Sequence, residues 1–599
     1  MEKLVRASSD LVTLPTIIGG LVSDALNSVY VDALGDFNAG QPGCSEAINA
    51  KLDSILGTSD SVYVFGTTRF IKVVFGYGTY ALNGTIVRSG VTWVGQGDYG
   101  TRLIPATGDS NAMFITVGTK PYDYNGVRSW ERLMYFSFKD FIVGQYWEER
   151  NEYPAGISAF DIKYASYGYF QNVRVRRIKA EALVFSELFD TYFDNVSIMY
   201  SGDNSNPSAL VHSLRMDKSG SDDATNACLF HRLHMEANYT GMRLHQCRHM
   251  IFSFPKFEGD RTSHLLEGCQ GVVFDTAEQT WLYNDTPQFL VSAVPGASGS
   301  DGWGVKFIGG ELISSSSGIG LYFRNTSQAG PLVLESISAR GVNTVVDGTN
   351  WVADNVDTYD CGPTIFKASG NCKLKNSSLL ACKKAAVGDG TDDTVLITGA
   401  NCSVVNTEFT GLSNGGAIPN GAFINSTAVG DTVITGNTYG GYRQYGHRVA
   451  VNANSIRDNR INVSNNFISA LSNLASSNYT FTNKNTRGLG IGAVDSEVVT
   501  VAAGATVARD KVGGCTEIRF RVIPSGGIAA SGIALVDSSN AGIQAMANTN
   551  SAVLGIGNPV AGSGKFHVSK PLAGNTVTLT NNLEVSAQVV LLYITAHAS

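Results

Sequence analysis

The sequence predicts an all-β chain in which a repetitive, solenoid-like domain is followed by a smaller β domain. Its 599 residues are too many for one ordinary globular core but suit a repeat protein that grows in one dimension. Glycine is abundant at 66 residues, proline is scarce at 15, and only 16% of residues are charged, a mixture that favours many short strands and tight turns. A short pattern also recurs between residues 230 and 313, as expected when successive coils stack on one another.

Charge, hydropathy and cysteine content exclude several classes of protein. The net charge of -7 and the absence of a long basic cluster argue against nucleic acid as a partner. No run of 18 or more apolar residues occurs, so membrane insertion is not expected. The nine cysteines are odd in number and show no C-x-x-C pairing, which predicts buried free thiols, no metal site and no cofactor.

The N-terminal region contains two expected elements. Residues 1–28 have too few apolar side chains for a core of their own and are interpreted as a docking peptide. Residues 45–56 place apolar side chains at 48, 52, 55 and 56, which predicts an amphipathic helix with Ser45 as its N-cap. Such a helix would cover the open end of a solenoid, where core and strand edges are otherwise exposed.

The recurring pattern consists of a phenylalanine, two residues, an apolar residue and an acid. Its copies begin at Phe254, Phe274 and Phe307. If each copy is one strand of a coil, Glu258, Glu278 and Glu311 form one column on the surface, with Glu236 and Asp260 two residues further along their own strands. Related copies run from about residue 138 to 409, so the pattern marks the coils in general. Only residues 230–313 combine it with histidine, arginine and tryptophan between two long polar loops, 200–222 and 284–303.

Two early strands carry a resemblance to a known family. Residues 73–82 read V-V-F-G-Y-G-T-Y-A-L and residues 90–97 read G-V-T-W-V-G-Q-G. With the preceding Gly35-Asp36-Phe37 and the helix, this succession resembles the start of a right-handed, single-stranded parallel β-helix of the pectate-lyase type. Among such proteins the module order resembles bacteriophage tailspikes, which are capsular polysaccharide depolymerases.

The resemblance implies an assignment for the whole chain. Residues 29–482 would form a catalytic parallel β-helix in a homotrimer, and residues 1–28 would bind the phage tail or another tail protein. The protein would be part of the virion, made in the bacterial cytoplasm and acting at the host cell surface on capsule or O-antigen polysaccharide.

The character of the sequence changes near residue 483. Alternating segments at 497–501, 517–522, 532–536, 576–579 and 587–594 are separated by Gly- and Asn-rich turns. This pattern predicts an antiparallel β-sandwich over residues 483–599. This domain is expected to hold a trimer together, to bind carbohydrate, or to do both, and the sequence does not decide between these roles.

The acidic column suggests the chemistry of a glycoside hydrolase. Neighbouring strands lie about 4.8 Å apart, and residues i and i+2 about 6.6 Å apart. Carboxylates about 5 Å apart suit a retaining mechanism, whereas about 6.5–9.5 Å leaves room for the water of an inverting one. Glu258 with Glu278 fits the first condition, and Glu236 with Glu278, or Glu258 with Glu311, fits the second, which we favour. The expected catalytic residues are Glu236, Glu258 and Glu278, supported by Asp260 and Glu311.

Other side chains of this stretch are expected to bind substrate. Aromatic rings stack on the apolar faces of sugars, and basic groups bind the acidic substituents common in capsules. The expected binding residues are His231, His234, Tyr239, Arg243, Arg248, Lys256, Arg261, Trp281, Tyr283 and Trp303.

Three alternatives remain open at this point. An outward column on a solenoid must be polar in any case, so glutamates at successive positions also fit a plain surface. A polysaccharide lyase on the same fold would abstract a proton beside a uronate carboxylate, with Arg243, Arg248, Lys256, Tyr239 or His234 as base and neutraliser. A receptor-binding spike without catalysis is the third.

Overall fold

The structure is a computed structural model. It describes residues 27–57, 70–106, 112–116, 132–146, 156–206, 210–218, 224–294, 304–314, 320–326, 330–362, 364–382, 393–411, 422–427, 432–441, 445–449, 455–457, 460–461, 494–510, 515–537, 542–560, 563–570 and 576–596. The chain divides into two compact units, residues 1–352 and 353–599, and each is described by itself. Most of the docking peptide predicted at 1–28 lies outside the described residues. Within the described residues, no helix is both long enough and apolar enough to cross a membrane.

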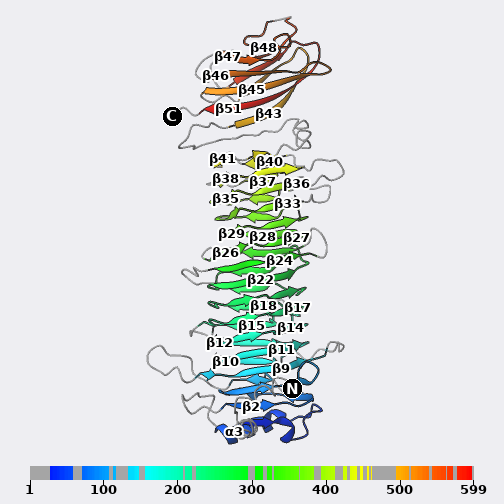
Figure 1. Cartoon of the computed structure of the whole chain (residues 1–599), viewed down its shortest axis with the longest axis vertical. Helices are drawn as coiled ribbons and strands as arrows, with labels where there is room; N and C mark the ends of the chain where they lie inside the picture. The colour runs from blue at the N-terminus through cyan, green and yellow to red at the C-terminus, as the bar shows by residue number, and fades with distance from the viewer. Residues whose placement is uncertain are drawn as a thin grey trace, which may run out of the picture. The chain divides into compact units, whose positions relative to one another are not determined.

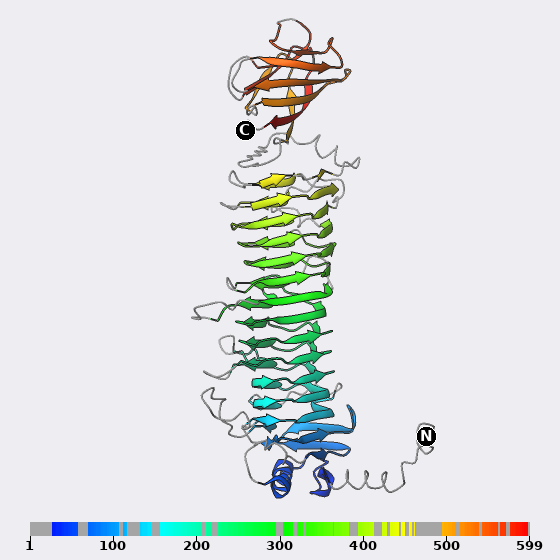
Figure 2. The same cartoon turned by 60° about the vertical axis from the view of Figure 1, so that its left-hand side comes forward.

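The first unit is a stack of parallel strands in two sheets (Figures 1 and 2). A typical coil has two short strands in the first sheet and one in the second. Strands of the first sheet are β1 (Ser28–Tyr30), β2 (Ile71–Val74), β3 (Gly78–Leu82), β5 (Val91–Val94), β6 (Thr101–Pro105), β9 (Ser137–Gly144), β11 (Tyr169–Arg176), β13 (Tyr192–Asp194), β14 (Ser197–Met199), β16 (Leu229–His231), β17 (His234–Glu236), β19 (Ile251–Ser253), β20 (Lys256–Glu258), β22 (Val272–Thr280), β24 (Val305–Ile313), β26 (Leu332–Glu335) and β27 (Ser338–Arg340).

The second sheet of this unit consists of the third strand of each coil. Its strands are β4 (Thr85–Ile86), β7 (Phe114–Ile115), β8 (Leu133–Met134), β10 (Phe160–Ser166), β12 (Leu183–Phe189), β15 (Leu214–Asp217), β18 (Met242–His245), β21 (His264–Glu267), β23 (Pro287–Ser292), β25 (Leu321–Asn325) and β28 (Thr344–Gly348). The next strand, β29 (Trp351–Asp354), belongs to the first sheet and spans the unit boundary. The expected fold class, a parallel β-helix, is therefore confirmed.

A stack of phenylalanine rings forms the core of the first unit. Phe230, Phe252, Phe274 and Phe307 are all fully buried, and their centroids follow one another at 4.7, 4.6 and 4.4 Å. Side chains alternate between the two faces of a strand, so each coil places its ring above the same position of the coil before. Offset stacking adds to the burial of these large apolar surfaces.

Left-handed residues turn the chain between the two first-sheet strands of each coil. In three early coils this corner is occupied by Asp140, Asn172 and Asn195, with φ of 61°, 52° and 55°. The Asn172 side-chain amide donates to the Asp140 carboxylate at 2.7 Å, and the Asn195 side-chain amide donates to Asn172 Oδ1 at 2.8 Å. Asparagine and aspartate tolerate this backbone conformation better than most residues, so the corner forms a polar ladder.

The predicted helix is α3 (Cys44–Leu56), preceded by the single turn η2 (Val31–Ala33). Ile48 and Leu52 are buried, as the amphipathic pattern predicts. The prediction of Ser45 as N-cap is wrong: the cap is Gly43 in the left-handed region, and Ser45 lies inside the helix. Its hydroxyl instead accepts from the Asn83 backbone N–H at 2.8 Å, and Asn49 accepts from the Ile86 N–H at 2.9 Å. The helix therefore satisfies backbone groups at the edge of β4.

The second unit contains further parallel strands and a β-sandwich. The parallel strands are β30 (Asp357–Tyr359), β31 (Phe366–Ala368), β32 (Lys373–Lys375), β33 (Ser378–Cys382), β34 (Val395–Ile397), β35 (Cys402–Val405), β36 (Glu408–Gly411), β37 (Ala422–Ser426), β38 (Thr432–Thr435), β39 (Thr438–Gly441), β40 (Tyr445–Val449), β41 (Ser455–Arg457) and β42 (Arg460–Ile461).

The sandwich consists of two sheets that enclose one apolar core. The five-stranded sheet has the order β43 (Val494–Val501), β51 (Ala587–Ala596), β45 (Cys515–Pro524), β46 (Ala530–Asp537) and β47 (Ile543–Asn548). The four-stranded sheet has the order β44 (Thr506–Asp510), β50 (Thr576–Asn581), β49 (Phe566–Ser569) and β48 (Leu554–Ile556). Pairing is antiparallel except between β48 and β49. Each segment predicted as a strand after residue 483 falls within one of these strands.

The prediction of buried free thiols is confirmed for the cysteines whose side chains the structure describes. Seven cysteines are buried and free: Cys44, Cys228, Cys247, Cys269, Cys361, Cys372 and Cys402. Burial raises the pKa of the Cys228 thiol to about 12, so this side chain is an inert core group.

Candidate functional site

Two outward-facing columns of polar side chains cross β17, β20, β22 and β24. His234 pairs with Lys256, Lys256 with Glu278, and Glu278 with Glu311 in the parallel register. We call this set the first column. Two residues further along the same strands lies the second column, Glu236, Glu258 and Thr280.

The predicted acidic column is therefore wrong in its register. Glu258 does not share a column with Glu278 and Glu311; it lies directly opposite Glu236. The cause is the choice of anchor, because the stacked ring of this coil is Phe252, whereas Phe254 is 54% exposed. Counting from Phe252 shifts Glu258 by two residues, which places it in the second column.

The columns meet in a compact cluster of charged groups. His234 Nε2 lies 3.0 Å from Glu258 Oε2 and 3.6 Å from Glu236 Oε2. Lys256 Nζ lies 3.1 Å from Glu258 Oε1 and 3.2 Å from Glu278 Oε1. Burial alone would lower the pKa of Lys256, but its hydrogen bonds to Glu258 and Glu278 outweigh burial and raise it. Lys256 therefore carries a positive charge within the cluster.

Glu236, Glu258 and His234 are the most enclosed members of the cluster. Their side chains are 26%, 31% and 28% exposed, respectively, compared with 47% for Glu278. One ligand atom of each of the three lies within 4.8 Å of the others, close enough to share a cation. The Lys256 ammonium already neutralises Glu258 at this point, so we do not assign a metal to the group.

Two of the predicted site residues are buried in the core. Asp260 is fully buried, and its Oδ1 accepts from the backbone N–H and the side-chain amide of Asn238 at 2.8 and 2.9 Å. Trp281 is also fully buried, and its Nε1 donates to the Thr286 carbonyl at 2.8 Å. The predictions that Asp260 supports catalysis at the surface and that Trp281 stacks on sugar are both wrong. Tyr283, 44% exposed, is the accessible ring beside Trp281.

Basic residues predicted to bind substrate are spread over several surfaces. Arg243 lies on β18 in the second sheet, where its Nε donates to Glu267 at 2.7 Å. Arg248 lies in the connection between β18 and β19, where its backbone forms isolated parallel β-bridges with Asn226 and Gln270. The register therefore places neither arginine in the two columns, which corrects the prediction that they belong to the same site.

Tyr239 and Arg261 follow the strands that carry Glu236 and Glu258. The Arg261 guanidinium lies over the Tyr239 ring, 4.5 Å from its centroid. This pair borders the second column. His231 lies on β16, before the corner. Trp303 lies outside the described residues.

Sequence reasoning missed two residues at the other border of the cluster, Arg232 and Phe254. Both occupy the corner that precedes the first column, both are exposed, and both have positive φ. The alternation in Phe252-Ser253-Phe254 gave no signal, because residues i and i+2 share a face of a continuous strand and both rings fit the buried stack equally well.

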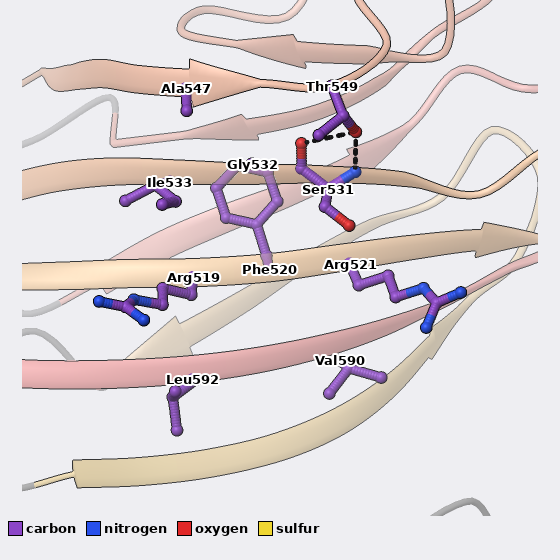
Figure 3. Close-up of a pocket in the computed structure, with 10 residues that line it drawn as sticks. All are labelled: Arg519, Phe520, Arg521, Ser531, Gly532, Ile533, Ala547, Thr549, Val590 and Leu592. Carbon is purple, nitrogen blue, oxygen red and sulfur yellow. Dashed lines mark hydrogen bonds between the residues drawn. The ribbon is translucent and has the colours of Figure 1, made fainter.

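A separate pocket of about 380 Å³ lies on the five-stranded sheet of the sandwich (Figure 3). Its lining residues are Arg519, Phe520, Arg521, Ser531, Gly532, Ile533, Ala547, Thr549, Val590 and Leu592. Thr549 Oγ1 accepts from the Ser531 N–H at 2.8 Å. No carboxylate lines this pocket, so it lacks the groups that two-carboxylate chemistry requires.

The chain was compared with known proteins. No family model and no curated protein matches the sequence. Among solved structures, a double-mutant tailspike protein of E. coli bacteriophage HK620 has 10% identity and a TM-score of 0.48, covering 96% of this chain and 94% of that one. A mutant of the same tailspike in complex with a hexasaccharide gives 10% and 0.44 over the same shares of both chains.

The catalytic domain of a GH87 alpha-1,3-glucanase in complex with nigerose gives 12% identity and a TM-score of 0.35, over 74% of this chain and 69% of that one. With TM-scores below 0.5, these likenesses carry no argument about substrate or mechanism, which rests on the geometry above.

Proposed function

We propose that the protein is a polysaccharide depolymerase that cleaves glycosidic bonds of a bacterial capsule or O-antigen by hydrolysis. The observation that carries the proposal is the pairing of Glu236 with Glu258 on adjacent coils, with His234 within 3.6 Å of both. Two carboxylates across a scissile bond are the usual machinery of glycoside hydrolases. The side chains of the cluster are 26–47% exposed on the outer face of the coils, so a polymer could reach them, as an endo-acting enzyme requires.

The spacing of the pair favours retention of configuration. Oxygen atoms of Glu236 and Glu258 lie within 4.8 Å of each other. Retaining enzymes hold their carboxyl groups about 5–5.5 Å apart, and inverting enzymes need about 6.5–9.5 Å for a water molecule. The sequence-based register favoured an inverting mechanism, but that register is wrong. We therefore propose a retaining mechanism.

The contacts of the two carboxylates assign their roles. Glu258 has two donors, the Lys256 ammonium and the His234 ring, which bind the anionic form that a nucleophile needs. Among the described residues the Glu236 carboxylate has only the longer contact to His234, so Glu236 becomes the general acid. Glu258 attacks the anomeric carbon while Glu236 protonates the leaving oxygen. Glu236 then removes a proton from water, which cleaves the glycosyl ester and regenerates both groups.

The activity is tested by incubating the full chain with purified capsular polysaccharides and lipopolysaccharides. Hydrolysis releases new reducing ends with no ultraviolet absorbance, and Glu258→Gln should lower its rate by about 10²–10⁴-fold. An absorbing, unsaturated product would show a lyase instead, with His234 or Lys256 as base. Intact polymer that remains bound after long incubation would show a non-catalytic spike.

The predicted assembly belongs to the same proposal. The homotrimer, the attachment of residues 1–28 to a phage tail and the place in the virion rest on the resemblance of the sequence to tailspikes. The sandwich would clamp the trimer or bind sugar, and its pocket with Arg519 and Arg521 would suit an acidic group. Light scattering that gives a monomeric mass would contradict the trimer.

A further inference from the structure

One corner of the β-helix changes character in the coils that carry the charged cluster. Arg232, Phe254 and Thr276 occupy it, with φ of 56°, 53° and 53°. The backbone N–H of Arg232 donates to the Ser253 carbonyl, and that of Phe254 donates to the Asp275 carbonyl, at 2.9 and 2.8 Å. Equivalent bonds join successive coils, so the three side chains project from one edge of the cluster.

Elsewhere the same corner holds residues suited to a left-handed backbone. Asp140, Asn172 and Asn195 precede this region, and Gly309 and Ser336 follow it at φ of 66° and 58°. A bulky aromatic residue is disfavoured in this conformation, because its Cβ crowds the backbone. Phe254 therefore costs stability at a position where asparagine would fit the ladder.

The Phe254 ring makes no compensating core contact. It is 54% exposed, and among the described residues its one ring contact is with the His231 imidazole, edge to face at 5.9 Å. It stands two residues before Lys256 and four before Glu258 on the same chain segment. A strained, exposed aromatic ring beside paired carboxylates fits a platform for a sugar ring, which presents an apolar face.

Arg232 lies next to Phe254 in the adjacent coil and supplies a charge. Its Nε donates to His231 Nε2 at 3.1 Å. Among the described residues no carboxylate lies within ion-pair distance of its guanidinium, whereas Lys256 is bound by two glutamates. Arg232 is exposed, so its remaining donors are available to bind an anionic substituent of a sugar that stacks on Phe254.

We propose that Phe254 and Arg232 form a subsite that binds a sugar residue bearing a carboxylate, adjacent to the Glu236 and Glu258 pair. This inference rests on the proposed function and narrows its substrate class to acidic polysaccharides. Phe254 supplies the stacking surface, and Arg232 pairs with the acid group. Both are binding residues that contact substrate away from the bond being cleaved.

The decisive variant is Phe254→Asn, which restores the residue type that the corner prefers. We expect its melting temperature to equal or exceed that of the wild type, while its affinity for an acidic polysaccharide falls by about 5–10-fold. Binding is measured by calorimetry in a Glu258→Gln background, so that cleavage does not interfere. Tyr167→Asn is the matched control, because Tyr167 is also an exposed ring with φ of 56° but stacks on Tyr135 in another corner.

The proposed pairing of Arg232 with a sugar carboxylate is tested with the Arg232→Gln variant and a carboxyl-reduced form of the same polymer. Arg232→Gln should weaken binding of the native polymer and leave binding of the reduced polymer unchanged. Equal binding by wild type and Phe254→Asn, in a protein that cleaves the polymer, overturns the subsite and leaves the proposed function intact. A wild type that neither binds nor cleaves any polysaccharide of the panel overturns both.

Discussion

Asp260 Oδ2 lies 3.3 Å from His264 Nε2 in the interior of the first unit, and both side chains are fully buried. His264 Nδ1 accepts a hydrogen bond from the Met242 backbone N–H at 3.0 Å, so the ring proton sits on Nε2 and faces the carboxyl group. Burial raises the pKa of Asp260 to about 7, with the charge of Glu236 adding to it, although hydrogen bonds from Asn238 act in the opposite sense. Burial lowers the pKa of His264 to about 3.

These two shifts predict opposite dependences of stability on pH. The Asp260 pKa is raised in the folded state, so its contribution is full below 3.8, the ordinary value, and is lost as pH rises towards 7. The His264 pKa is lowered, so its contribution is full above 6.5 and is lost as pH falls towards 3. Between about pH 4 and 6.5 the two groups therefore change the folding stability of the wild type in opposite directions as pH rises.

Single variants should separate the two slopes. Relative to wild type, the melting temperature of Asp260→Asn should rise with pH between 4 and 6.5, and that of His264→Phe should fall, each corresponding to at most about 1.4 kcal/mol per pH unit. Phenylalanine preserves the packing of His264 against Phe257 and Phe289. If the melting temperatures of both variants changed with pH as that of the wild type does, the pair would not titrate in this range.

The register of the glutamates predicts unequal effects of three conservative variants. Glu236→Gln and Glu258→Gln should each lower the rate of hydrolysis by about 10²–10⁴-fold, because each removes an acid–base or nucleophilic group. Glu278→Gln removes only an exposed ion pair with Lys256, worth about 0–1 kcal/mol, so its rate should fall by no more than about fivefold. Reducing-end assays at saturating polymer measure these rates. A loss with Glu278→Gln as large as with Glu258→Gln would contradict the assignment.

The retaining mechanism has its own test. The first product released by wild type should have the anomeric configuration of the substrate, as followed by NMR before mutarotation. In Glu258→Ala the nucleophile is absent, and added azide should restore bond cleavage by attacking the anomeric carbon directly, giving a glycosyl azide of inverted configuration. Glu236→Ala keeps the nucleophile and serves as the comparison. An inverted first product from wild type would reject Glu258 as nucleophile.

Much of the fold could be predicted because its determinants are local. The abundance of short apolar segments, the repeat of about one coil and the helix at 45–56 all follow from side-chain periodicity. The change near residue 483 likewise marks a shift from short parallel strands to longer alternating ones. These features need no knowledge of which strand lies beside which.

The candidate site could be predicted only in part because it depends on register. A slip of two residues keeps every side chain on its own face, so the pattern Phe252-Ser253-Phe254 allows two alignments that are equally amphipathic. Only packing distinguishes them, since Phe252 continues the ring stack and Phe254 takes the left-handed corner. Asp260 and Trp281 were misplaced for a related reason: both lie where the chain turns, and alternation no longer reports which side is inside.

This ambiguity leads to a direct test of the register. Phe252 is fully buried between Phe230 and Phe274 at 4.7 and 4.6 Å, so Phe252→Ala leaves a cavity and should destabilise the protein by about 3–5 kcal/mol. Phe254→Ala removes an exposed ring and should leave stability nearly unchanged. The ratio of unfolded to folded protein in urea measures both variants under the same conditions, and circular dichroism checks that the β-structure persists. If Phe254→Ala were the more damaging of the two, Glu258 would return to the column of Glu278, and the pairing of Glu236 with Glu258 on which the mechanism depends would be lost.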